Sequence, residues 1–140
     1  MIALDVFGQP EGLPRPRAVR RGLHAGVYQE HPTWQGLVTL RSHQVRAANP
    51  EWTGEGPLEI RCDFRLRRPK SAPKRKVKPH TGRPDLDNLL KSTFDGLVPA
   101  LIENDAAIVK VSACKRYALP GEVPGATIVI QDEGEPCPTG

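Results

Sequence analysis

The sequence is poor in cysteine, in aromatic residues and in long apolar runs. Its three cysteines stand far apart among 140 residues, which excludes a disulfide framework and a CxxC zinc site and indicates a reducing compartment. No apolar run approaches the ~20 residues that span a bilayer. The first residues lack the basic and apolar regions of a secretory signal. We therefore expect a cytoplasmic protein without a membrane partner.

The basic residues are concentrated in one part of the chain. The formal net charge is +4, but residues 61–91 carry eleven Lys or Arg against three Asp, so this segment is +8 and the remainder is −4. Concentrated positive charge steers and holds phosphate groups, which indicates a polyanionic partner. The alternative is a solvated surface run without a partner, which is the more common explanation for a charge run taken by itself.

Hydrophobic periodicity divides the chain into strands, helices and loops. Strand patterns, with alternating or β-branched apolar residues, occupy 2–7, 58–66, 106–117 and 126–131, with a further short strand at 23–29. Helical spacing occupies 33–48 and a second segment that ends near Val98. This order predicts an α/β (α+β mixed) fold: a small single domain over 1–131, with a mixed sheet and two main helices, followed by a flexible tail at 132–140.

Several residues with distinctive side chains are predicted to have no catalytic role. Trp34 occupies an apolar position of the first helix, and Cys62 and Cys114 occupy strand positions, so all three are expected in the core. His80 lies in the long basic loop before the second helix, and we expect it to have no role in proton transfer.

Two aspartates, Asp85 and Asp87, precede the second predicted helix. Residues two apart point to one side of an extended chain but diverge by about 200° within a helix, so a shared site requires the helix to begin at or just after Asp87. The alternative is that one aspartate only caps the helix. A third acid, Asp105, follows the helix, and we expect the next turn to return it toward the other two.

Three converging carboxylates bind a hard cation, Mg²⁺ or Mn²⁺. Such an ion activates water for phosphodiester hydrolysis, and metal-binding acids surrounded by basic residues are typical of a nuclease. Lys91 lies one helical turn after Asp87, where its ammonium can stabilise charge in the transition state. The alternative is an ordinary surface ion pair with Asp87 or Asp95. Asn88 is a candidate for capping the helix or orienting a carboxylate.

The motif Asp85-Leu86-Asp87-Asn88-Leu89-Leu90-Lys91, followed by Phe94-Asp95-Gly96-Leu97 and Asp105, resembles the RusA-type Holliday junction resolvases that are common in prophages. The likeness covers 82–111, and Pro14-Arg15-Pro16-Arg17 resembles the family's N-terminal basic segment. It implies a RusA-like fold in a bacterial or phage-infected cell, and a homodimer that makes paired symmetric nicks in four-way junction DNA during recombination and repair, with Mg²⁺ or Mn²⁺. It also implies that the catalytic residues are Asp85, Asp87, Asp105 and Lys91, of which the three aspartates bind the metal.

We expect loops at residues 8–22 and 67–83, and basic residues on both are expected to contact DNA phosphates, which gives affinity without base recognition. These residues are Arg15, Arg17, Arg67, Arg68, Lys74, Arg75, Lys76, Lys78 and Arg83. One position departs from the family pattern, because the family often has two adjacent aspartates where this chain has Asn104-Asp105.

Two other functions stay open at this point. One is a non-catalytic basic accessory protein that binds DNA, although acids on a phosphate-binding face weaken binding unless a metal occupies them. The other is a nuclease that acts on branched or flap DNA in general, or on RNA. A comparison of branched with linear substrates separates these functions from junction resolution.

Overall fold

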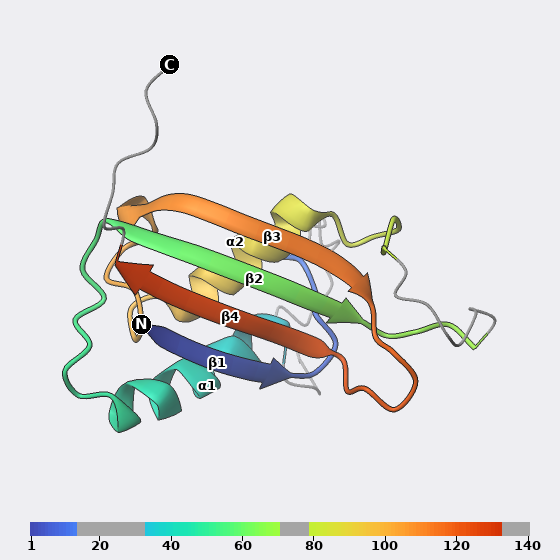
Figure 1. Ribbon diagram of the computed structural model, residues 1–140, viewed down its shortest axis with the longest axis horizontal. Coiled ribbons are helices and arrows are strands. Elements are labelled where there is room, and N and C mark those ends of the chain that lie inside the picture. The colour runs from blue at the N-terminus through green and yellow to red at the C-terminus, as the bar shows by residue number, and fades with distance from the viewer. Residues whose placement is uncertain (14–32, 71–78, 133–140) are drawn as a thin grey trace, which may run out of the picture.

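A computed structural model describes residues 1–13, 33–70 and 79–132 of the chain. In this part of the chain the elements follow the order β1 (Ile2–Phe7), α1 (Trp34–Ala48), β2 (Leu58–Leu66), α2 (Leu86–Leu97), the short 3₁₀ helix η1 (Asp105–Ala107), β3 (Ile108–Tyr117) and β4 (Gly125–Asp132). Both α-helices lie on one face of a single sheet (Figure 1). This arrangement confirms the predicted fold class.

The sheet is mixed, with the strand order β1-β4-β2-β3. Strands β2 and β3 are parallel, whereas β4 is antiparallel to both β1 and β2. A parallel pair requires a crossover connection, and α2 is the helix of that crossover. Consequently α2 runs back along the sheet, from the end where β2 and β3 terminate toward the end where they begin (Figure 1).

The core lies between the sheet and the two helices. Alternate residues of β2, including Phe64, are fully buried against the helices, as the period of two requires. Trp34 of α1 is buried, contacts Phe64 edge-on with ring centroids 6.5 Å apart, and donates its indole N–H to Thr93 of α2 at 2.9 Å. The predicted core position of Trp34 is therefore confirmed, and its hydrogen bond joins the two helices.

The two cysteines expected in the core have different environments. Cys62 is fully buried, as predicted. The prediction for Cys114 is wrong, because its register partner on β2 is Asp63, which lies on the face of the sheet away from the helices. Cys114 is exposed and its thiol donates to Asp63 Oδ1 at 3.0 Å. The pKa of the Cys114 thiol is raised, mainly by this hydrogen bond and to a smaller extent by partial burial.

Element ends differ from the sequence predictions by one or two residues. The strand expected from residue 106 begins at Ile108, because η1 occupies Asp105–Ala107. Strand β4 continues to Asp132, one residue beyond the expected end of the domain. The expected strand at 23–29 and the tail at 133–140 lie outside the described residues. Within the described residues, no helix is long and apolar enough to cross a bilayer.

Candidate metal and nucleic-acid site

Asp85 and Asp87 lie at the N-terminal end of α2. Asp85 is the N-cap residue, with the extended backbone angles φ −68° and ψ 148°, and Asp87 lies in the first helical turn. The helix thus begins at Leu86. This is one residue earlier than expected, because a metal site shared by Asp85 and Asp87 was expected to require a helix that begins at or just after Asp87. Because Asp85 is outside the helix, the wide angular separation of two helical residues does not apply, and an N-cap side chain lies beside the first turn.

The two carboxylates are exposed and available for a ligand. Asp85 makes no side-chain capping bond, so the alternative of a purely capping aspartate is not realised. Within the described residues, neither Asp85 nor Asp87 has an ion pair within 4.0 Å. Mg²⁺ is commonly bound through one or two carboxylates, with water and substrate phosphate completing its shell. The donor set at this helix end therefore fits Mg²⁺ or Mn²⁺.

Asp105 lies at the opposite end of the domain. The twelve residues of α2 span about 18 Å. Figure 1 shows the start of α2 and the start of β3, which η1 directly precedes, at opposite ends of the sheet. No group of three or more acidic, His or Cys side chains in the described chain is placed to hold a metal ion. The expectation that Asp105 returns to Asp85 and Asp87 is wrong within one chain, because the return path is β3 and Asp105 precedes that strand.

Lys91 is exposed on α2, one turn after Asp87. In the described part of the chain, no ion pair within 4.0 Å joins its ammonium to Asp87 or Asp95. The alternative of a helix-surface ion pair is therefore not realised. Asp87 and Lys91, at i and i+4, share one helix face, so the Lys91 ammonium is available on the same side of α2 as the Asp87 carboxylate.

Only some of the predicted DNA-binding residues fall within the described chain. Arg67 and Arg83 are exposed near the end of the sheet where α2 begins. Arg68 is half-buried, and its guanidinium donates to the Ala118 carbonyl at 3.5 Å. The other predicted phosphate contacts lie outside the described residues: Arg15, Arg17, Lys74, Arg75, Lys76 and Lys78.

Comparison with known proteins identifies the family. The family described as "Endodeoxyribonuclease RusA" matches residues 8–131, which include all four predicted catalytic residues. The chain belongs to the RusA endodeoxyribonuclease family. It is also 28% identical over 142 residues to "Uncharacterized protein YqaN" of Bacillus subtilis (strain 168), an alignment that covers 94% of this chain and 96% of that protein. The resemblance drawn from the acidic motif is thus confirmed.

Asn104, where the RusA family often has an aspartate, is the N-cap of η1. Its side-chain oxygen accepts a hydrogen bond from the Ala106 N–H at 2.9 Å. Asn and Asp cap helices about equally well. The amide therefore preserves the local turn that precedes β3 and leaves Asp105 exposed at the first position of η1.

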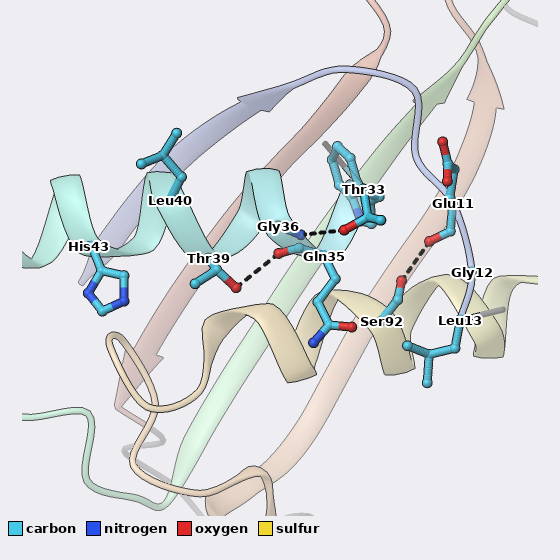
Figure 2. A pocket seen from close by; sticks show the side chains of 11 residues that line it. Glu11, Gly12, Leu13, Thr33, Gln35, Gly36, Thr39, Leu40, His43 and Ser92 are labelled. Atoms are coloured by element: carbon cyan, nitrogen blue, oxygen red, sulfur yellow. Dashed lines mark hydrogen bonds between the residues drawn. The ribbon is translucent and has the colours of Figure 1, made fainter. Parts of the chain in front are cut away.

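Asn88 and Ser92 attach the N-terminal part of this RusA-family chain to α2. Asn88 Oδ1 accepts from the Leu13 N–H at 3.2 Å, and Asn88 Nδ2 donates to the Leu13 carbonyl at 3.5 Å. The Ser92 hydroxyl donates to the Glu11 carbonyl at 2.7 Å (Figure 2). Asn88 therefore holds a backbone segment instead of a carboxylate. The segment leads directly into the predicted basic arm that starts at Pro14.

A pocket of about 740 Å³ lies beside this segment, between residues 11–13 and the first two-thirds of α1 (Figure 2). Its walls include Glu11, Gln35, Thr39, His43 and Ser92. Neither of the paired aspartates nor Lys91 lines it. The pocket is thus separate from the acidic site at the start of α2.

His80 is held against β3 in the segment that leads to Asp85. Its ring meets Tyr117 with centroids 4.8 Å apart, and its backbone N–H donates to the Lys115 carbonyl at 3.3 Å. Burial, and next the positive charge of Lys115, lower the pKa of His80. Through these contacts, His80 packs on β3 and holds the segment before Asp85 against the sheet.

Gly12 lies against Asn88 of α2, without space for a Cβ atom. A Cβ atom at this position would lie 2.1 Å from Asn88 Nδ2 and 2.6 Å from Asn88 Cγ. We expect Gly12→Ala to lower the free energy of unfolding by about 1–3 kcal/mol, the usual cost of overpacking, as measured by urea denaturation. Gly82→Ala is the matched control, because its nearest neighbour would be His80 Cε1 at 3.8 Å. Equal stability of the two variants would show that residues 11–13 do not pack on α2.

Proposed function

We propose that this RusA-family protein resolves four-way DNA junctions by metal-dependent hydrolysis of phosphodiester bonds, with paired symmetric nicks. The observation that supports this function best is the pair of exposed carboxylates, Asp85 and Asp87, at the start of α2. Lys91 lies on the same helix, and the exposed Arg67 and Arg83 lie near this end of the sheet. Carboxylates repel nearby DNA phosphates unless a cation binds both the carboxylates and the phosphate.

Each of these residues has a distinct role in the proposed reaction. Asp85 and Asp87 would hold Mg²⁺ or Mn²⁺, which when bound supplies an activated water and neutralises charge on the phosphate. Lys91 binds a non-bridging oxygen of the scissile phosphate and stabilises the negative charge that develops there. Arg67 and Arg83 contact neighbouring phosphates and orient the strand without reading its sequence.

The third proposed ligand, Asp105, comes from a second copy of the chain. Within one chain, Asp85 and Asp87 lie at the N-terminal end of α2, whereas Asp105 lies beyond its C-terminal end. A homodimer with a two-fold axis has two such composite sites, as symmetric cutting of two strands requires. The surface next to Asp105 supports a contact between copies, since Val109 and Val111 on the edge strand β3 are 50% and 42% exposed.

The test is cleavage of a labelled four-way junction with and without Mg²⁺, beside a linear duplex of the same sequence. We expect symmetric nicks that require the metal and an uncut duplex. Tight junction binding without cleavage in Mg²⁺ or Mn²⁺ would favour the accessory DNA-binding protein. Equal cleavage of flaps and junctions would favour a general branched-DNA nuclease.

A further inference from the structure

Lys115 of β3 binds the backbone of the segment that leads into Asp85. Its ammonium donates to the carbonyls of Gly82 and Pro84, each at 2.7 Å. Its own carbonyl accepts from the His80 N–H at 3.3 Å. A single residue of the sheet thus holds three points of the segment immediately before α2.

The side chain of Lys115 reaches this segment because of its place in the sheet. Lys115 is paired in register with Phe64, whose side chain is fully buried under the helices. Cross-strand partners share one face of a sheet, so Lys115 points toward the helix layer. Among the described residues, no carboxylate lies within 4.0 Å of its ammonium. Its hydrogen-bonding partners in this region are backbone carbonyls.

The bond to Pro84 fixes the backbone at Asp85. The Pro84 carbonyl belongs to the same planar peptide group as the Asp85 nitrogen and Cα atom. A hydrogen bond from a charged donor is stronger than a neutral one, so it holds the orientation of that plane. The Asp85 side chain makes no capping bond of its own. The direction of its carboxylate therefore depends on the backbone that Lys115 holds.

We infer that Lys115 is a positioning residue of the nuclease site, which orients Asp85 for the metal by holding the Gly82 and Pro84 carbonyls. This role rests on the proposed function. It differs from that of Lys91, which is exposed on α2 and available to the substrate phosphate. A lysine that only stabilised the fold would affect thermal unfolding and leave the metal affinity of the folded protein unchanged.

The inference is tested by Mn²⁺ binding to the DNA-free protein, measured by electron paramagnetic resonance, and by junction cleavage. For Lys115→Met we expect the Mn²⁺ dissociation constant to rise about 10- to 100-fold, the usual effect of losing a residue that orients a metal ligand. Cleavage falls by a similar factor, while junction affinity in EDTA is unchanged. Lys115→Arg restores most of the Mn²⁺ affinity, because a guanidinium also donates several N–H groups.

Lys110→Met is the matched control on the same strand, since the Lys110 ammonium lies 3.7 Å from Glu59 on the other face of the sheet. It should bind Mn²⁺ like the wild type. Lys115→Leu, which also lacks a hydrogen-bond donor, is measured in parallel in case Lys115→Met does not fold.

Wild-type Mn²⁺ affinity in folded Lys115→Met or Lys115→Leu would overturn the role of Lys115 alone. A wild-type protein that neither binds Mn²⁺ nor cuts the junction would overturn the proposed nuclease and this role together.

Discussion

Asp87→Asn abolishes metal-dependent cleavage of a four-way junction, while junction binding is retained or strengthened. Asp87 is exposed in the first turn of α2 beside Asp85. The amide cannot supply the charged oxygen that a hard cation prefers. Loss of the metal's several kcal/mol of transition-state stabilisation corresponds to a rate decrease of about a thousandfold or more. Binding is preserved because the substitution removes a negative charge that repels phosphate.

This expectation is checked by single-turnover cleavage and by junction binding in EDTA. Asp95→Asn is the matched control, because Asp95 is exposed two turns later on the same helix and the substitution changes the charge equally. Its cleavage should remain close to that of the wild type. Loss of junction binding by folded Asp87→Asn protein would contradict the assignment of Asp87 to a metal site.

Mixing two inactive variants, Asp87→Asn and Asp105→Asn, restores cleavage if Asp105 completes the site of a second copy. In a mixed dimer, one composite site contains both substitutions and the other contains none. Random exchange of subunits makes about half of the dimers mixed, so about a quarter of all sites are intact. Because each active dimer has one working site, the expected product is a junction with a single nick.

The control for this experiment is a mixture of Asp85→Asn with Asp87→Asn. Both residues lie at the start of the same helix, so each composite site of a mixed dimer contains one substitution and no activity returns. Co-expression of two tagged copies ensures that mixed dimers form. Absence of cleavage in the mixture of Asp87→Asn with Asp105→Asn, with mixed dimers present, would show that Asp105 does not act across the dimer.

The helices and strands could be predicted from the sequence because each depends on the pattern of apolar residues within its own segment. Alternation of apolar residues located β2 at its observed ends, and helical spacing located α1 within one residue. The acidic motif with Lys91 identified the family over residues that are continuous in the chain. Such patterns depend on the period of each element and on residues a few positions apart.

The relations between distant residues were decided by the tertiary structure. Asp105 and Asp85 are separated by a crossover helix, and the parallel pairing of β2 with β3 places them at opposite ends of the sheet. Cys114 is exposed because the register with β2 sets its face. The contacts of Asn88 with Leu13 and of Lys115 with Pro84 join residues 75 and 31 positions apart. The sequence by itself determined the elements and the chemistry of the motif, whereas strand direction and register, which depend on packing between distant segments, decided which groups meet.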